Sequence, residues 1–313
     1  MFKKLIKKAR DLLINQVQNQ RELDNIKIQN GMIYSILLSG NLKNIKDLSE
    51  INFKVFSQNN EDGIIDYLIQ SLKIRDIKFI EIGTEDYSES NTRYLFEKTF
   101  CRGLLVDNSH NLKKKISSML KIWKGQLEIC NQFINSKNIL NILRQYEFDK
   151  NIDILSLDID GIDYWILKEL PQQFSKILVC EYNPYFGPDI EVTVPNMDNF
   201  NRTDYHYSNL CWGVSLKSLI KIQEEKGYTF VGTNNLKNNA FFVLKDLTHK
   251  LSINLPNTDE LEMYTNANFQ ESLDNTGKLN FLKSNDILNY IKDCEVINLK
   301  NNGQEKVKLK EII

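Results

Sequence analysis

The sequence predicts an α/β fold, in which helices cover both faces of a doubly wound, mostly parallel sheet. Five apolar runs rich in β-branched residues recur between residues 77 and 183, and segments with the 3.6-residue spacing of helices separate them. Strands that alternate with helices pair in parallel, because each crossover returns the chain to the same edge of the sheet. The chain of 313 residues has room for one domain of about 200 residues with extensions at both ends.

The segment 1–50 is expected to form an amphipathic helix and a linker. Apolar residues recur at helical spacing from Phe2 to Val17, and most of the basic residues between positions 3 and 10 fall on the other side. We favour a cap that packs on the domain or on a partner subunit. In the second case, the chain would be a homo-oligomer through this helix. A basic helix lying on a membrane surface is the alternative.

The main domain is placed at 51–248, and it begins with a helix expected over Glu61–Leu72. The expected strands are Ile77–Gly83, Gly103–Asp107, Gln126–Ile134, Ile152–Asp160 and Lys176–Asn183, and the expected helices between and after them are Asn91–Lys98, Tyr164–Leu170 and Ser215–Lys226. The last two runs, Tyr228–Thr233 and Ala240–Leu244, predict an antiparallel hairpin that closes the sheet. In the C-terminal extension, 249–313, we expect one helix near Asp286–Ile291 and no chemistry.

The composition narrows the class of partner. A net charge of -1 lacks the basic excess of a nucleic-acid-binding protein, so a small-molecule partner is expected. No run approaches the roughly 18 apolar residues of a membrane span, and the N-terminus does not resemble a secretory signal. We therefore expect a cytoplasmic protein without stable membrane insertion. The five cysteines are odd in number and form no CxxC pair, which favours reduced thiols over a disulfide framework or a zinc site.

Acidic residues follow the first two expected strands, at the edge of the sheet where ligands bind in this class of fold. The first strand ends at Gly83, and three acids, Glu85, Asp86 and Glu89, lie in the loop after it. They would repel a pyrophosphate, so a cationic or zwitterionic ligand is favoured. The second strand ends at Asp107, which is placed to accept hydrogen bonds from a ribose.

These stretches resemble the class I S-adenosylmethionine-dependent methyltransferases, and more narrowly the FkbM-like group that often modifies sugars and surface polysaccharides. The resemblance covers about Phe56 to Leu244 and implies a seven-stranded Rossmann-like methyltransferase sheet. The stretches that carry it are Ser57 to Gly63, Glu81-Ile82-Gly83 with Ser90-Asn91-Thr92, Leu104 to Asn108, Ser156 to Gly161, Glu181 to Pro184, and Asn239 to Val243.

Carried over, the resemblance implies that S-adenosylmethionine is the cofactor. Glu81, Gly83 and Asp86 would shape the methionine pocket, Asp107 would hold the ribose, and Asn131 or Gln132 would lie near the adenine. Further cofactor contacts are expected from Gln58, Glu61, Ser88, Asn91, Asn108 and Asp158. Only Gly83 remains of the glycines often found in the first loop, which leaves the contacts of Thr84 and Ser88 open.

Oxygen ligands also gather after the fourth and fifth strands. Asp158 and Asp160 share one face, and Glu181 and Asn183 share the corresponding face of the next strand. Three interpretations stay open. In one, Asp158 and Glu181 bind Mg²⁺, as in the metal-dependent sugar and catechol O-methyltransferases that this arrangement resembles. In the others, the acids include a metal-free base or are structural.

The segment 185–212 is an expected substrate insertion rich in aromatic and hydrogen-bonding side chains, which suit the faces and hydroxyls of a sugar. The expected substrate contacts are Asn183, Tyr185, Tyr205, Tyr207 and Trp212. Asp160 or His206 is the expected general base, since methyl transfer to a hydroxyl releases a proton. A surface position for His206 is the alternative.

The predicted function is therefore S-adenosylmethionine-dependent O-methyl transfer to a sugar hydroxyl. The acceptor would be a small molecule or nucleotide-linked sugar, as a precursor of a capsule or lipopolysaccharide. Methylation of a phosphate-type or amine acceptor, and a non-catalytic nucleotide-binding Rossmann-like domain, are the alternatives.

Overall fold

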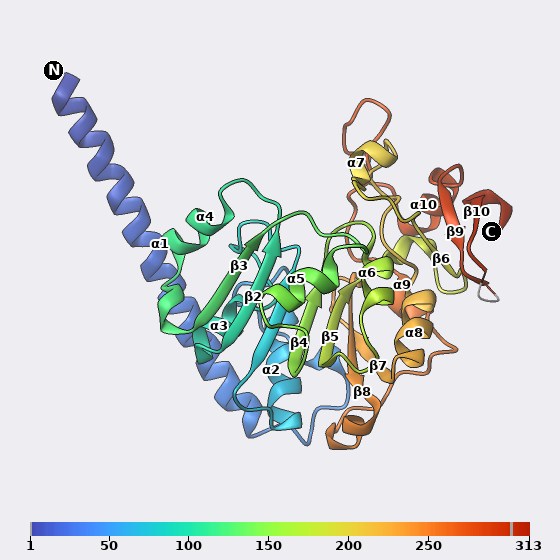
Figure 1. The fold of residues 1–313 in the computed structure, drawn as a ribbon, viewed down its shortest axis with the longest axis horizontal. Coiled ribbons are helices and arrows are strands. Elements are labelled where there is room, and N and C mark those ends of the chain that lie inside the picture. Colours follow the sequence, from blue (N-terminus) through green and yellow to red (C-terminus); the bar gives the residue numbers. More distant parts are fainter. Residues whose placement is uncertain (1, 301–302) are drawn as a thin grey trace.

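The computed structural model describes residues 2–300 and 303–313, and the side chains of all of these except 2–14, 284 and 285. A seven-stranded sheet with the order β3-β2-β1-β4-β5-β8-β7 forms its centre (Figure 1). The strands are β1 Lys78–Ile82, β2 Arg102–Asp107, β3 Gln126–Asn131, β4 Ile152–Leu157, β5 Ser175–Glu181, β7 Tyr228–Thr233 and β8 Asn239–Leu244. The first five pair in parallel, and β8 runs antiparallel to both β5 and β7. The predicted doubly wound, mostly parallel seven-stranded sheet with its closing antiparallel hairpin is confirmed.

Strand order reverses between β1 and β4, which lie side by side at the middle of the sheet. Chain crossovers leave β1 toward β2 in one direction and β4 toward β5 in the other. The loops after these strands therefore diverge and open a crevice at their carboxyl ends. This places the loops after Ile82 and Leu157 at the crevice.

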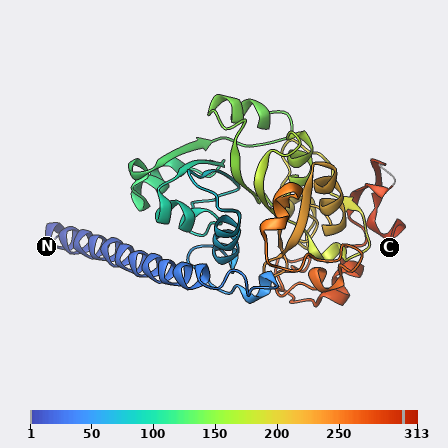
Figure 2. The same cartoon turned by 90° about the horizontal axis from the view of Figure 1, so that it is seen from below.

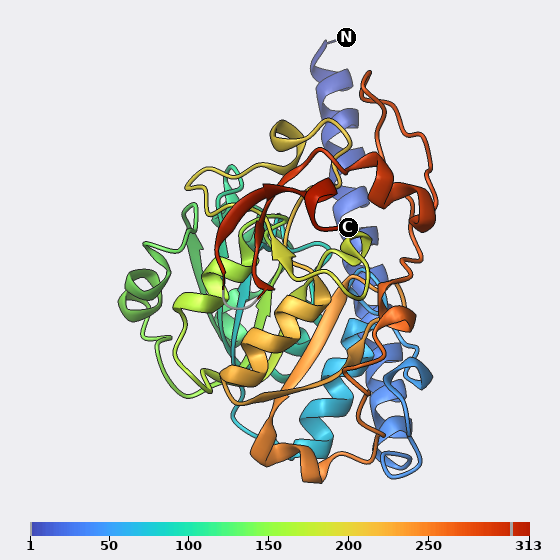
Figure 3. The same cartoon turned by 90° about the vertical axis from the view of Figure 1, so that its right-hand side faces the viewer.

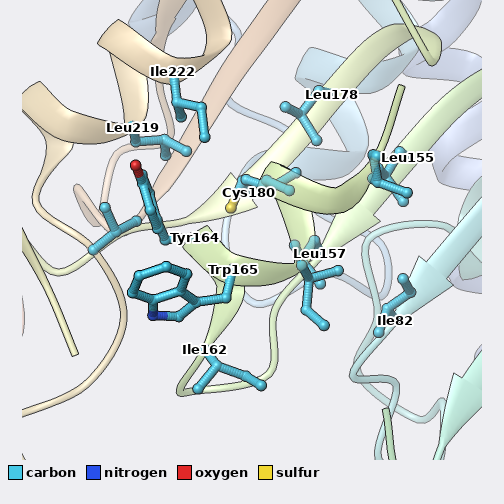
Figure 4. Close-up of a cluster of buried hydrophobic side chains, with 14 of the residues drawn as sticks. Ile82, Leu155, Leu157, Ile162, Tyr164, Trp165, Leu178, Cys180, Leu219 and Ile222 are labelled. Carbon is cyan, nitrogen blue, oxygen red and sulfur yellow. The ribbon is translucent and has the colours of Figure 1, made fainter. Parts of the chain in front are cut away.

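Helices cover both faces of the sheet (Figure 3). One face carries α2 Glu61–Leu72, α3 Arg93–Thr99 and α4 Leu112–Met119, and the other carries α5 Ile139–Gln145, α6 Asp163–Glu169 and α8 Leu216–Glu225. Alternation along the strands sends Phe79 to the first core and Ile80 to the second. In the second core, Leu178 and Cys180 of β5 belong to the same buried cluster as Trp165 of α6 (Figure 4).

The N-terminal helix α1 spans Phe2–Ser39, so it is longer than predicted, and its C-terminal half packs on α2 and α3. Its N-terminal end extends beyond the rest of the molecule (Figure 2). The apolar side chains predicted to form one face between Phe2 and Leu13 lie outside the described side chains, whereas Val17 is 51% exposed. Among the residues that the structure describes, no helix has the length and apolar character needed to cross a membrane.

A second, three-stranded sheet joins the predicted insertion to the C-terminal extension. Its order is β10-β9-β6, with β6 at Val192–Thr193, β9 at Glu295–Asn298 and β10 at Glu305–Lys308. The short helices of these two segments are α7 Arg202–Tyr205, α9 Glu262–Thr265 and α10 Ser284–Tyr290. Elsewhere along the chain, and within these segments, short 3-10 helices occur at Leu48–Glu50, Ile122–Lys124, Pro184–Phe186, Lys245–Lys250 and Leu309–Glu311. Only α10 was predicted, because β9 and β10 are short and few of their side chains are buried.

The expectation of five reduced thiols is wrong. Cys211 of the insertion and Cys294 of the extension form a disulfide, with their Cα atoms 6.5 Å apart, within a core that includes Ile287 and Ile291. Eighty-three residues separate the two cysteines, and pairing of β6 with β9 brings their segments together. Neither the count nor the spacing of the cysteines signals that pairing. Cys101, Cys130 and Cys180 are free.

Candidate functional site

A cavity of about 480 Å³ opens at the carboxyl ends of β1, β2, β4 and β5, where strand order reverses. Its walls also include Phe200 and Arg202 from the insertion and Phe269 and Glu271 from the C-terminal extension. Eight carboxylates and one guanidinium line it. A neutral or positively charged ligand is therefore favoured over a phosphate.

Gly83 sets the shape of the loop after β1. Its φ is +84°, and a Cβ at this position would lie 1.5 Å from the carbonyl oxygen of Asp158. Glycine is the residue that tolerates both the left-handed backbone and the close approach. The loops after β1 and β4 are thus in direct backbone contact at the floor of the cavity.

Glu81 fixes the rest of that loop from inside the sheet. Its carboxylate accepts hydrogen bonds from the Ser90 hydroxyl at 2.6 Å, from the backbone nitrogens of Asn91 and Thr92 at 3.0 and 3.1 Å, and from the Thr92 hydroxyl. Burial raises the pKa of Glu81, against the lowering effect of these hydrogen bonds. Glu81 lines the cavity, and its saturated carboxylate makes it an anchor for the segment that leads into α3.

Asp107 lies at the end of β2, where it was predicted to hold a ribose. One of its oxygens accepts from the backbone nitrogen of Glu85 at 2.8 Å, and the other accepts from the nitrogen and hydroxyl of Ser109 at 2.7 and 2.6 Å. A carboxylate has about four acceptor positions, so one remains on the oxygen that contacts Glu85. Asp107 is half-buried and lines the cavity, which leaves this position accessible to a ligand hydroxyl.

Three acids converge at the ends of β4 and β5, as predicted. Oxygens of Asp158, Asp160 and Glu181 lie within 4.8 Å of one another. Burial, followed by the charges of neighbouring acids, raises the pKa values of Asp158 and Glu181 well above their ordinary ranges. Within the described part of the chain, Glu181 Oε2 has no hydrogen-bond partner, and neither has Oδ1 of Asn239, which lies opposite Glu181 in the β5–β8 pair.

Asp163, at the start of α6, holds the loop that carries two of these acids. Its carboxylate accepts from the backbone nitrogens of Ile159 and Gly161, both at 3.0 Å, and burial raises its pKa to about 6. Asp160 lies between them with a φ of +52°. The positioning of Asp160 therefore depends on Asp163, a residue that the sequence did not single out.

Arg202 connects the acids to the C-terminal extension. It forms ion pairs with Asp160 at 2.6 Å and Glu271 at 2.9 Å, and its guanidinium lies 5.6 Å from the centre of the Trp212 ring. Although burial lowers the pKa of Arg202, the two carboxylates raise it more, so the guanidinium stays charged. Phe200, Phe269 and Glu271 were not predicted as site residues, and the extension, in which no chemistry was expected, contributes two of them to the cavity wall.

The predicted substrate contacts do not line this cavity. Asn183 is fully buried and binds the backbone of Leu210 and Trp212, while Tyr185 and Tyr205 donate to the carbonyls of Phe269 and Glu295. Trp212 is buried beneath Arg202, and Tyr207 packs against Tyr290. Of these side chains, Tyr185 and Tyr205 pack into the core that the insertion shares with the extension, whereas Trp212 belongs to the core of the main sheet.

His206 is likewise outside the cavity, so the structure gives no support to its predicted role as base. Its Nδ1 lies 2.6 Å from the Ser208 hydroxyl, it is half-buried, and its ring faces Tyr207 and the Cys211–Cys294 disulfide. Burial lowers its pKa.

The predicted cofactor residues divide into two groups. Gln58, Asn91, Asn108 and Asp158 line the cavity together with Glu81, Gly83 and Asp107. Glu61, Asp86, Ser88 and Asn131 do not. Glu61 instead accepts from the amides of Asn234 and Asn239, and Asn131 donates to the carbonyls of Asp107 and Ser109, with its neighbour Gln132 on the cavity wall.

No protein-family model matches this chain, and no curated protein matches it. Among solved structures, a putative hemolysin from Lactococcus lactis is similar over 66% of this chain and 96% of its own, with 12% identity and a TM-score of 0.39. An O-methyltransferase family protein from Burkholderia thailandensis is similar over 69% and 70%, with 10% identity and a TM-score of 0.34. An S-adenosylmethionine-dependent methyltransferase from Clostridium acetobutylicum is similar over 59% and 90%, with 11% identity and a TM-score of 0.38. These likenesses extend no further than the fold.

Proposed function

We propose that this protein is an S-adenosylmethionine-dependent methyltransferase that acts on a hydroxyl of a sugar. The observation that carries the proposal is the acidic cavity at the strand-order reversal, with Gly83 at its floor and Asp107 at its rim. A sulfonium nucleoside is positively charged and carries a ribose, so this cavity complements both of its features. When bound, the cofactor supplies an electrophilic methyl group.

The chain's own residues divide the work between two sides of the cavity. On the cofactor side, the remaining acceptor position of Asp107 binds a ribose hydroxyl, and Glu81 holds the loop that surrounds the methionine portion. On the acceptor side, Phe200 and Phe269 offer apolar surface to a sugar ring, while the Arg202–Glu271 pair orients hydroxyls. Holding the reacting atoms in line would lower the barrier to methyl transfer by about 7 kcal/mol.

Carboxylates that could accept the proton of the acceptor hydroxyl lie nearby. Asp160 is half-exposed and paired with Arg202, whereas Glu181 is buried and Asp158 half-buried, and both have raised pKa values. A buried carboxylate with a raised pKa is a stronger base than an exposed one. Without a bound cation, we therefore assign the base to the ionised carboxylate of the Asp158–Glu181 pair and no longer to His206.

We also propose a divalent cation at this cluster, with Mg²⁺ as the candidate. The two buried oxygens without partners, on Glu181 and Asn239, are those that a hard cation would satisfy. A proton shared by Asp158 and Glu181 is the metal-free arrangement. Activity that is lost in EDTA and recovers with Mg²⁺ supports the cation, and activity indifferent to EDTA supports the shared proton.

The cofactor assignment is tested by calorimetry with S-adenosylhomocysteine. Asp107→Ala should weaken binding about 10- to 100-fold, because it removes a hydrogen bond to a charged acceptor. Asp86→Ala is the matched control: it removes an acid from the neighbouring loop that does not line the cavity, and affinity should stay within about 3-fold. Equal affinities in both variants, or binding of NAD or ATP in place of S-adenosylhomocysteine, would refute the assignment.

The acceptor is tested by a methyl-transfer screen with mass-spectrometric detection. The first acceptors to test are sugar precursors of a capsule or lipopolysaccharide, either free or linked to a nucleotide. The diphosphate of a nucleotide-linked sugar would have to lie outside the cavity, because the lining acids would repel it. An amine acceptor is the second candidate, because eight lining carboxylates would hold an ammonium group. Methylation of amino sugars at nitrogen, with no transfer to hydroxyls, would select the second.

A further inference from the structure

One face of α1 is apolar, and its side chains are exposed among the residues that the structure describes. Leu23, Ile26, Ile33 and Leu37 are 54%, 53%, 56% and 64% exposed, and Asn30 lies among them, also exposed. Successive members of this set are three or four residues apart, so they form one continuous line along the helix. We call these five residues the outer stripe.

The outer stripe cannot turn inward, because the other side of α1 is fixed to the domain. Asp24 is buried in an ion pair with Arg93, and Ser35 binds Gln70 and Lys98. A Cβ on Gly31 would lie 2.7 Å from both Tyr94 and Val55, so the helix is already in close contact there. These residues lie on nearly the opposite side of the helix from the outer stripe, at 100° per residue.

The spacing of the stripe continues toward the N-terminus in the sequence. Positions alternately three and four residues apart are occupied by Phe2, Leu5, Ala9, Leu12, Gln16, Asn19, Leu23, Ile26, Asn30, Ile33 and Leu37. This is the seven-residue repeat of a coiled coil, in which Leu23, Asn30 and Leu37 are a positions and Ile26 and Ile33 are d positions. The helix of 38 residues is about 57 Å long, at 1.5 Å per residue.

We propose that α1 pairs with α1 of a second copy of this chain in a parallel, in-register, two-stranded coiled coil. Leucine at a with isoleucine at d by itself favours three or four strands, but the asparagine at the a position within the stripe, Asn30, favours a parallel pair, because two such side chains meet across the axis. Charge agrees with this register: Glu22, at a g position, faces Lys27, at an e position, of the other helix, and the pair occurs twice by symmetry.

The two domains would not collide in this arrangement. Each domain lies on the side of α1 away from the outer stripe, so the dyad axis between the helices leaves one domain on either side. The N-terminal end of α1, which extends beyond the rest of the molecule, would run alongside its counterpart (Figure 2). The dimer does not depend on the proposed enzymatic activity.

The mass of the full chain in solution tests the proposal. Sedimentation equilibrium should give twice 36.6 kDa for the wild type. Ile26→Glu with Ile33→Glu should raise the dimer Kd at least about 100-fold, because four charges would be buried. Gln18→Glu with Asn25→Glu is the matched control, since it adds the same charges seven residues apart at exposed positions outside the stripe. Its dimer Kd should stay within about 3-fold of the wild type.

Two results would overturn the dimer. One is a monomeric wild type at tens of micromolar, including a monomer that binds vesicles of anionic phospholipid, which would assign α1 to a membrane surface. The other is a dimer unaffected by Ile26→Glu with Ile33→Glu. Circular dichroism and thermal melting of each variant verify that the domain is folded.

Orientation needs its own test. Asn30→Cys should form an interchain disulfide under mild oxidation, because a positions of parallel, in-register helices face each other. Glu22→Lys and Lys27→Glu should each weaken self-association and should form a mixed dimer when combined. A dimer in which Asn30→Cys does not cross-link, and in which the charge variants do not prefer each other, would overturn the parallel register.

Discussion

At the scale of single residues, the site depends on positions where one side chain, or the lack of one, determines the geometry. Gly83 allows backbone contact with Asp158, and the Glu81 carboxylate accepts its hydrogen bonds from the loop that follows β1. Gly83 was predicted from the end of a strand, and Glu81 from the family resemblance. The anchoring role of Glu81 involves donors nine to eleven residues away, just before α3.

Gly83→Ala should destabilise the protein by about 2–4 kcal/mol and abolish S-adenosylhomocysteine binding, since the new methyl group would overlap the Asp158 carbonyl. Gly277→Ala is the control for backbone strain: its φ is +78°, with no atom near the position of a Cβ. That variant should lose only about 1 kcal/mol. Urea denaturation and calorimetry measure the two effects, and equal losses would argue against the close contact.

Glu181→Gln should stabilise the metal-free protein at neutral pH. Burial raises the pKa of Glu181, so the folded state retains a proton that the unfolded chain releases above about pH 4.3. Wild-type stability therefore falls as pH rises from that value toward the folded-state pKa. The variant lacks this titration, so it should be more stable than the wild type at pH 7.

Urea denaturation in EDTA between pH 4 and pH 8 measures this difference, which should disappear at the acidic end. Excess Mg²⁺ should stabilise the wild type and leave Glu181→Gln largely unchanged. A variant less stable than the wild type at pH 7 in EDTA would mean that the buried carboxylate is ionised and stabilised by neighbours.

At the scale of elements, the acceptor wall is assembled from two segments far apart in the sequence. Residues 185–212 and the C-terminal extension share β6, β9 and β10, a small core and one disulfide. Tyrosines and Trp212 looked like substrate contacts because they are dense in one loop. In the structure, Tyr185 and Trp212 are buried in the cores and Tyr207 lies exposed beside Tyr290. Phe269 and Glu271 reach the cavity from an Asn-rich stretch without a periodic signal.

Cys294→Ser should lower the free energy of unfolding by about 2–4 kcal/mol, because the disulfide closes a long loop. S-adenosylhomocysteine affinity should not change, since the cofactor residues lie on the main sheet. Dithiothreitol should reproduce the loss in the wild type and have no effect on the variant. Thermal melting and calorimetry provide the measurements, and a variant with reduced cofactor affinity would contradict this separation.

At the scale of the whole molecule, the sheet was predictable because its strands follow one rule. β4 and β5 are apolar on both faces, as strands between two helical layers must be, and turn residues separate them from helices. The small second sheet follows no such rule: β6 has two residues, and its partner lies about a hundred residues later. Its pairing depends on tertiary contacts, which a single sequence does not encode as a local pattern.

The backbone contact between Gly83 and Asp158 also has a consequence for ligand exchange. Two loops that touch without intervening side chains cannot slide past each other, so the sheet side of the cavity is fixed. We therefore expect ligands to enter and leave past the opposite wall. There, Phe200, Arg202, Phe269 and Glu271 belong to segments outside the main sheet, and Arg202 forms ion pairs with Asp160 and Glu271.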